Sequence, residues 1–419
     1  MDVMGLIALL ISLSALFMYI NYRYLKLPET IGIMILSLFC SLILIFIKAT
    51  GISDFESIIK IVQDIDFEKT LMNGMLSFLL FAGALHVNIN DLAKQKWIIL
   101  VLATIGVVSS TLLVGSITYI ILTYFNIFNS SYSLLIYCML FGSLISPTDP
   151  ISVLGILKEA KAPKTLETKI TGESLFNDGV GVVVFMVIAQ MLPSASHNSH
   201  GDISPIGLFA QEAIGGIIFG FIIGWIFYRL LKSVDNYSLE ILLTLSLVSG
   251  GYYIAGLLHI SGPIAMVVAG LLIGNQGKMF AMSEITHKQL FSFWELIDEF
   301  LNAVLFLLMG MVVISFSFDI AAIVLGIALI GIVLFIRYLC ITSTIEIFRF
   351  RRSFTKGANF IMTWGGLRGG ISVAMALSLP NSEYRDTFIL VTYIIVLFSI
   401  IVQGLTVKPL IKYFLKDES

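Results

Sequence analysis

The chain has 419 residues, of which 58% are hydrophobic and only 12% are charged, and its formal net charge is −2. A soluble domain carries about 25% charged residues, so this composition excludes a soluble globular protein and indicates one that crosses a membrane many times. The net charge is uninformative about partners. We expect the chain to lie in a lipid bilayer and to bind no nucleic acid.

Apolar runs predict thirteen transmembrane helices, because a helix needs about 20 apolar residues to span a bilayer. The expected spans are 3–22, 29–48, 70–88, 97–122, 132–157, 170–192, 206–231, 238–258, 262–276, 290–316, 319–346, 357–380 and 387–411. The first run lacks the basic residues that precede a signal peptide's apolar core, and we interpret it as a spanning helix. Residues 50–69 are mixed and charged, which favours an interfacial helix or a loop.

Two of these helices contain residues that interrupt a helix. The fifth contains Ser146-Pro147-Thr148-Asp149-Pro150, in which two prolines remove backbone donors. The twelfth contains Gly365-Gly366-Leu367-Arg368-Gly369-Gly370, in which four glycines make a regular helix improbable. Irregular backbone at membrane depth is tolerated only where it lines a cavity or is buried in protein.

The two interrupted helices hold corresponding positions in two groups of six helices that run in opposite directions. We therefore expect an all-α membrane protein with inverted repeats at 1–192 (helices 1–6) and 238–419 (helices 8–13). Residues 193–237 join them and comprise the polar loop 193–205 and a connecting helix 7. Paired interrupted helices in two halves of a chain point to the central site of a transporter.

The distribution of basic residues fixes the expected orientation. With the N-terminus outside, 19 of the 25 lysines and arginines fall on the cytoplasmic side, four fall outside, and two, Arg337 and Arg368, lie within helices. Because lysine and arginine collect on the cytoplasmic side of membrane proteins, this layout predicts a cytoplasmic C-terminus.

The sixth predicted helix carries a stripe of polar residues in the middle of an apolar run. Glu173, Ser174, Asn177 and Asp178 fall within one arc of about 140° on the helix. An acidic residue inside the membrane is costly and is by default a candidate functional residue. We therefore place the functional site on this stripe, at the interrupted fifth helix.

The residue types at this site suit a cation. Asp178 on the sixth helix and Thr148, Asp149 and free carbonyls of the fifth are oxygen ligands, which hard cations prefer. Burial raises the pKa of a carboxylate in general, so near neutral pH such a group holds either a proton or a cation. One carboxylate that serves the two ions in turn is sufficient for an exchanger.

Other residues near the site have more than one interpretation. Glu173 and Arg368 are expected to form a structural ion pair, since a buried arginine needs a carboxylate. Asp149 either binds the ion or neutralises the ends of the interrupted helices, and Asn177 is expected to hold these helices by hydrogen bonds. Glu295, Asp298 and Glu299 form either a cation-attracting mouth or a solvated helix face.

The chain contains no motif typical of an enzyme or of a resident cofactor. There is no nucleotide-binding glycine loop, zinc motif or nucleophile–base pair, and the three cysteines lie in apolar runs without metal-binding or disulfide spacing. We therefore expect a protein that is not an enzyme and that needs no cofactor besides the ions it moves.

Three motifs together resemble the NhaP/NHE branch of the cation:proton antiporters. They are Ser146–Pro150, the run Thr171-Gly172-Glu173-Ser174-Leu175-Phe176-Asn177-Asp178-Gly179-Val180-Gly181, and Gly365–Gly370, in that order. The resemblance implies a thirteen-helix fold, a homodimer in the bacterial inner membrane, a core domain that moves against a dimer domain, and exchange of sodium or lithium for protons in pH homeostasis.

The resemblance also assigns roles to residues. It makes Asp178 the carrier of cation and proton, Ser174 and the Thr148 main chain further cation ligands, Glu173 the partner of Arg368, and Asn177 a stabiliser of the crossing. An Asn-Asp pair in place of Asp-Asp implies electroneutral one-for-one exchange. Many relatives carry an acidic residue after the phenylalanine of helix 3, where this chain has Phe81-Ala82-Gly83.

Two alternatives remain open at the level of the sequence. A potassium/proton antiporter would use the same residues, with a slightly different arrangement of the oxygen ligands around the cation. A cation channel would use the buried acids to ring a pore, although a single titratable site in inverted repeats argues against it.

Overall fold

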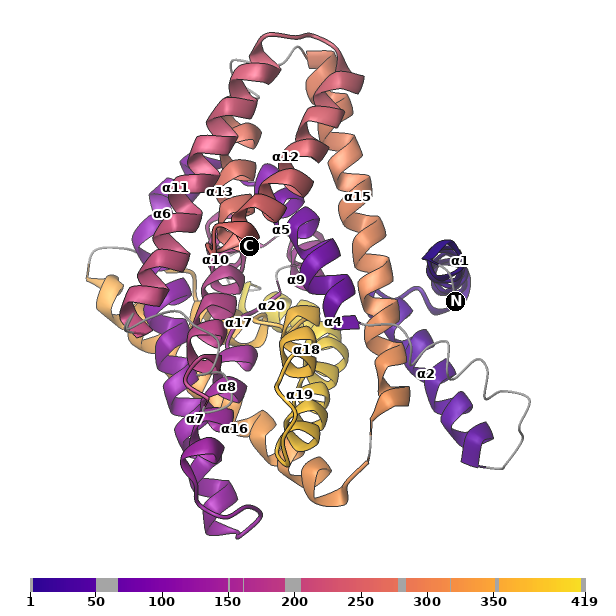
Figure 1. Cartoon of the computed structure of the whole chain (residues 1–419), viewed down its shortest axis with the longest axis vertical. Helices are drawn as coiled ribbons and strands as arrows, with labels where there is room; N and C mark the ends of the chain where they lie inside the picture. Colours follow the sequence, from indigo (N-terminus) through magenta and orange to yellow (C-terminus); the bar gives the residue numbers. More distant parts are fainter. Residues whose placement is uncertain are drawn as a thin grey trace.

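The computed structural model describes residues 3–49, 67–149, 151–160, 162–192, 205–277, 284–316, 318–350 and 354–415. Within these ranges every regular element is a helix, which confirms the predicted all-α membrane fold (Figure 1). Nine helices of the described ranges are long and apolar enough to cross a membrane, and two shorter apolar helices, Tyr132–Ile145 and Gly262–Gly277, accompany them. Residues 50–66 of the predicted segment 50–69 and residues 193–204 of the predicted loop 193–205 lie outside the described residues.

The N-terminal half contains the helices up to Ala189. They are α1 (Val3–Ile20), α2 (Glu29–Ala49), α4 (Phe67–Lys69), α5 (Leu76–Leu85), α6 (Ile89–Val101), α7 (Val107–Tyr124), α8 (Tyr132–Ile145), α9 (Ile151–Glu159) and α10 (Lys164–Ala189). Short π-helical turns continue α4 into α5 and α6 into α7, so each pair forms one longer rod.

The C-terminal half contains the remaining helices. They are α11 (Pro205–Lys232), α12 (Tyr237–Leu257), α13 (Gly262–Leu272), α15 (Glu284–Met311), α16 (Ile320–Arg349), α17 (Ala358–Trp364), α18 (Gly370–Leu377), α19 (Arg385–Phe398) and α20 (Gly404–Leu415). A π-helical turn, Ser399–Gln403, joins α19 to α20.

Side-chain caps explain where several of these helices begin. The side chains of Ser131, Asn236, Ser261 and Asp319 accept hydrogen bonds from backbone N–H groups in the first turns of α8, α12, α13 and α16. Each cap supplies an acceptor to donors that have no partner within the helix. The polar residues between apolar runs therefore set the ends of the spanning helices.

The structure is consistent with both expected interruptions. α8 ends at Ile145 and α9 begins at Ile151, and α17 ends at Trp364 and α18 begins at Gly370. The residues between each pair have no regular structure where they are described. The division into two inverted six-helix repeats stays a prediction.

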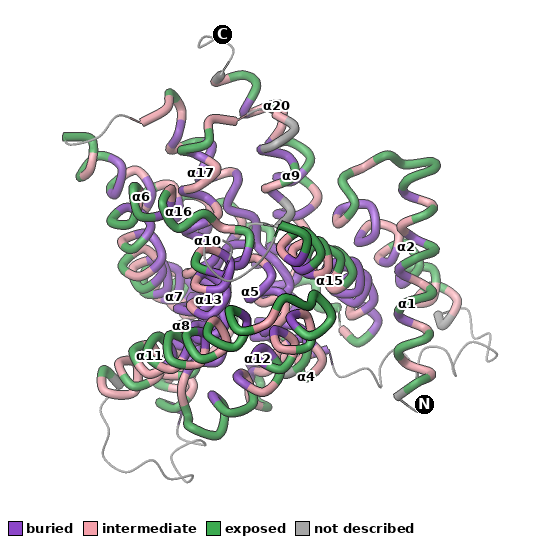
Figure 2. Tube along the Cα trace, turned by 90° about the horizontal axis from the view of Figure 1, so that it is seen from above, coloured by how far each residue is buried: buried purple, intermediate pink, exposed green. Residues whose placement is uncertain are grey.

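The helices pack into two neighbouring groups. In one, α13 packs against α5 and α11, and α15 packs against α2 and α5. In the other, α7 packs against α8, α16 against α19, and α10 against α8. Figure 2 shows buried residues concentrated where α5, α10, α13 and α15 approach each other, and exposed residues on the outward faces of α1, α11 and α12.

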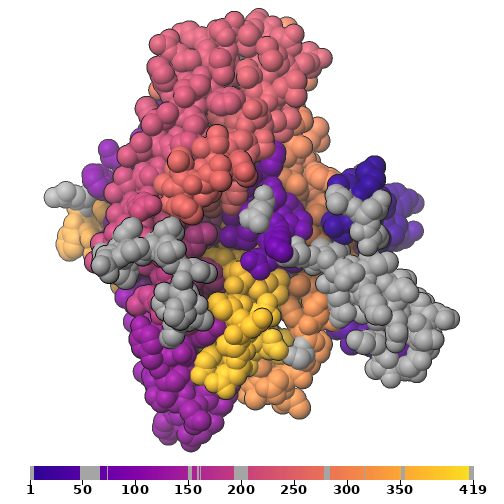
Figure 3. All heavy atoms as spheres, viewed as in Figure 1, coloured from indigo at the N-terminus to yellow at the C-terminus, as the bar shows by residue number. Residues whose placement is uncertain are grey.

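The outward faces are apolar. α11 exposes Ile218, Phe221, Ile222 and Trp225, as a helix that faces lipid does. In the space-filling view, α11 and α12 form one end of the molecule, and α1 and α2 stand at its side (Figure 3). The polar stripe of α10 lies inside, because Glu173, Ser174, Asn177 and Asp178 are all buried.

Candidate functional site

The two interrupted segments are joined by hydrogen bonds at the centre of the site. The backbone N–H of Asp149 donates to the carbonyl of Leu367 over 2.8 Å. The Arg368 guanidinium donates through Nη1 to the carbonyls of Ser146 and of Pro147, the latter at 2.7 Å. The last carbonyls of a helix have no partner within it and attract positive charge, so Arg368 completes the end of α8.

A hydrogen-bond network ties the interrupted fifth helix to α10. The Thr148 backbone N–H donates to Asn177 Oδ1 over 3.2 Å, and Asn177 Nδ2 donates to Thr148 Oγ1 over 2.9 Å. The hydroxyls of Thr148 and Ser174 are 2.9 Å apart. Asn177 thus has the position that the sequence predicts, with hydrogen bonds to the residue beside Asp149.

The buried glutamate of α10 has a different partner from the one that the sequence predicts. Glu173 Oε1 lies 3.0 Å from Arg337 Nη1, and both side chains are less than a tenth exposed. The expected ion pair of Glu173 with Arg368 is therefore wrong in its partner. Arg368 is held instead by the carbonyls of Ser146 and Pro147, just after α8, while α16 brings Arg337 to the carboxylate.

Arg337 fits at this position because the residue opposite it is a glycine. Its Nη2 donates to the carbonyl of Met362 over 3.2 Å. A Cβ at Gly366 would overlap the guanidinium, so the interrupted helix leaves room for the arginine only with glycine here. A charge within the apolar run of α16 was the available sequence signal for this functional residue.

A cavity of ≈ 960 Å³ leads from the surface to Asp178. Asp149 and Asp178 both line it, and Asp178 is 6% exposed. Among the described residues, the Asp178 carboxylate has no hydrogen bond and no ion pair, and Arg368 attracts it electrostatically without contacting it. Thr148, Ser174 and Asn177 are buried behind this wall and do not line the cavity, so the structure brings all the predicted residues together but opens only the two aspartates to it.

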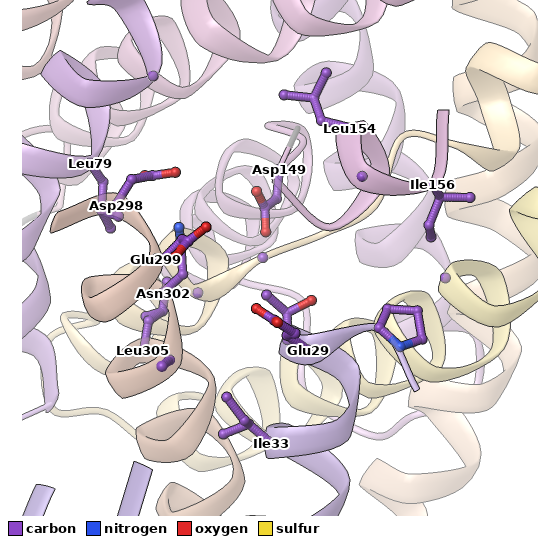
Figure 4. Close-up of a pocket in the computed structure, with 18 of the residues that line it drawn as sticks. Glu29, Ile33, Leu79, Asp149, Leu154, Ile156, Asp298, Glu299, Asn302 and Leu305 are labelled. Atoms are coloured by element: carbon purple, nitrogen blue, oxygen red, sulfur yellow. The ribbon is translucent and has the colours of Figure 1, made fainter. Parts of the chain in front are cut away.

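Further acidic residues line the same cavity. Glu295, Asp298 and Glu299 of α15 and Glu29 of α2 all do so, and Figure 4 shows Glu29, Asp298 and Glu299 around the space below and beside Asp149. This placement favours the mouth over the simple solvated face. Gly83 of α5 also lines the cavity, and α5 contains no acidic residue.

The chemistry of the site suits reversible binding of a small cation. In the described part of the chain there is no group of three or more His, Cys, Asp or Glu side chains that would hold a metal ion. A single carboxylate at the inner end of a wide cavity holds an ion weakly enough to release it.

The chain is similar to known proteins along nearly its whole length. Residues 12–413 match the family described as sodium/hydrogen exchanger, transmembrane. The chain is 46% identical to the Na(+)/H(+) antiporter NhaP of Pseudomonas aeruginosa over 98% of its length and 96% of that protein. It is 34% identical to the Na(+)/H(+) antiporter NhaH of Halobacillus dabanensis, with 98% of each chain covered.

A solved structure shares the fold. The sodium proton antiporter MjNhaP1 from Methanocaldococcus jannaschii superposes with a TM-score of 0.75, with 19% identity, and 98% of each chain is covered. At this identity the likeness establishes the arrangement of the helices and nothing finer.

Proposed function

The chain belongs to the sodium/hydrogen exchanger family, and we propose that it is a secondary active antiporter that exchanges sodium or lithium for protons. Its relatives over nearly the whole length are sodium/proton antiporters. Members of this family transport ions and do not convert a substrate chemically.

The observation that carries the proposal is the position of Asp178. Its carboxylate lines the cavity next to the two interrupted segments, and no cationic side chain of the described residues forms an ion pair with it. A buried carboxylate without an ion-pair partner has a high free energy, which a bound metal cation or proton lowers. Sodium, lithium and the proton then compete for one group.

The neighbouring oxygens complete the cation's shell. Ser174 lies one helical turn before Asp178, and its hydroxyl is hydrogen-bonded to that of Thr148. A small rotation of these two hydroxyls brings oxygen ligands to a cation at Asp178. Asp149 lines the same cavity and stabilises positive charge there. Glu173 with Arg337, and Arg368 with the α8 carbonyls, keep the frame rigid and are not carriers.

One cation exchanges for one proton in this mechanism. Asn177 stands beside Asp178 and cannot titrate, and Glu173 is neutralised by Arg337. A single carboxylate then carries either one sodium ion or one proton across the membrane, and the cycle moves no net charge.

The cavity opens to the cytoplasm in the proposed orientation. Lys26 and Lys408 line its outer part, and the positive-inside rule places both on the cytoplasmic side. Release outside requires that the helices around Asp178 move against the α2–α5–α13–α15 group. We place the protein in the bacterial inner membrane as a homodimer that serves pH homeostasis, with the N-terminus outside and the C-terminus inside.

Ion flux in everted membrane vesicles tests the proposal. Addition of sodium or lithium to respiring vesicles should dequench a pH-sensitive dye, and potassium at equal concentration should not. Dequenching by potassium alone would establish the potassium/proton alternative. Flux that does not saturate and moves no protons would establish a channel.

A further inference from the structure

Asn302 is a buried polar residue that the exchange mechanism leaves unused. It lies on α15, lines the cavity and is 3% exposed, and its Oδ1 has no hydrogen-bond donor among the described residues. A buried acceptor without a partner is unfavourable, so it calls for a ligand or a function.

Asp298 lies one helical turn before Asn302 on the same inward face. Trp294, a further turn back, is fully buried, whereas Glu295 and Glu299 beside this row are exposed. Residues four apart on a helix share a face. α15 therefore turns Asp298 and Asn302 toward the cavity, where Figure 4 shows both in the wall.

Asp149 faces this pair from the opposite wall. In Figure 4 the carboxylates of Asp298 and Asp149 point into the same space. Asp149 lies close enough to interact electrostatically with both Asp298 and Asp178. Like charges that face one another across a cavity are stabilised by a cation between them.

We propose that Asp298, Asn302 Oδ1 and Asp149 form a second binding site for a monovalent cation, from which the ion passes to Asp178. This vestibule site rests on the proposed antiport function. Its ligands are a carboxylate from each wall and an amide oxygen, all of which suit sodium or lithium. The cavity of ≈ 960 Å³ leaves room for water, so the ion keeps part of its hydration shell there.

The vestibule site raises the local sodium concentration next to Asp178. Loss of its charge slows loading from the cavity but leaves the translocation step unchanged. Asp298→Asn should therefore raise the apparent KM for sodium on the cytoplasmic side roughly tenfold, with kcat nearly unchanged, given the strength of a partly buried charge interaction.

Sodium binding to the purified full-length protein in lipid nanodiscs tests the site, with radioactive sodium at alkaline pH as the probe. Asp178→Asn should keep a weak, saturable sodium-binding phase, and Asp178→Asn/Asp298→Asn should lose it. Asp298→Glu in the Asp178→Asn background should restore part of it. Glu284→Gln removes an exposed acidic side chain at the start of the same helix and should leave the phase intact.

The outcomes are distinct for the two proposals. Equal binding by Asp178→Asn and the double variant, including none by either, would overturn the vestibule site. A phase that magnesium abolishes at a concentration far below that of sodium would also overturn it, because the site would then be one for divalent cations. A wild-type protein that neither binds sodium or lithium nor exchanges them would instead contradict the proposed function.

Discussion

Asp178 distinguishes itself from the other buried charges by what surrounds it. Glu173 has Arg337, and Arg368 has the carbonyls of Ser146 and Pro147, whereas Asp178 faces the cavity. A charge that the protein does not neutralise is available to a transported ion. The same reasoning distinguishes the residue that carries the ion from charged residues nearby that only hold the helices together.

Asp178→Asn should abolish sodium-dependent proton flux and leave the protein folded. The substitution removes the only carrier, and it also removes a buried charge that has no hydrogen bond or ion pair among the described residues, so the melting temperature should equal or exceed that of the wild type. Dye dequenching in everted vesicles and thermal unfolding in detergent measure the two effects. Flux near the wild-type level in a folded variant would show that another group carries the ions.

Glu173 and Arg337 should be strongly coupled in stability. Glu173→Gln leaves a buried arginine unpaired, which costs about 3–5 kcal/mol, and Arg337→Met leaves a buried carboxylate unpaired at a similar cost. The double variant should recover a large part of this loss. A double-mutant cycle on the free energy of unfolding measures the coupling.

The same cycle with Arg368 is the matched comparison. Arg368 donates to backbone carbonyls, so its coupling with Glu173 should be clearly smaller. A larger coupling for Glu173 with Arg368 than with Arg337 would restore the pairing that the motifs alone suggest.

At the level of elements, the interruptions and the stripe could be predicted, and the partners across helices could not. Proline and glycine act on their own backbone, so Pro147 and the glycines around Arg368 indicate a break wherever the helix packs. Which arginine reaches Glu173 depends on how α16 is rotated and placed. Arg337 lies 164 residues from Glu173 in the sequence, and no local pattern links them.

The cavity illustrates the same limit. In the sequence, Glu295, Asp298 and Glu299 are compatible with a solvated helix face or with a cation-attracting mouth. Helical periodicity shows which residues share a face and not what lies opposite that face. Only the packing of α15 against α2 and α5 turns Asp298 toward Asp149. The unpartnered oxygen of Asn302 has no counterpart in the sequence pattern at all.

Gly366 tests how closely the interrupted twelfth helix fits Arg337. Gly366→Ala should destabilise the protein by about 1–3 kcal/mol, because the new methyl group displaces the guanidinium from Glu173. Gly331→Ala on α16 is the control, since a Cβ there meets no atom within 4 Å and alanine favours the helix. Equal unfolding free energies for the two variants would contradict the close fit.

At the scale of the whole molecule, exchange should not respond to the membrane potential. Each half-cycle carries one positive charge on one carboxylate, in opposite directions. Sodium-driven proton flux in proteoliposomes should be the same with and without a potential clamped by valinomycin and potassium. A rate that follows the potential would indicate a second titrating carrier, for which Asp149 is the nearest candidate in the cavity.

The central claim is that sodium and the proton compete for Asp178, and the pH dependence of the apparent KM for sodium tests it most directly. In everted vesicles, that KM should rise about tenfold for each pH unit below the pKa of the site, while the rate at saturating sodium recovers. The full profile should be bell-shaped, since at high pH too few protons displace the cation. A KM for sodium that stays constant while the maximal rate falls on acidification would contradict competition at one carboxylate.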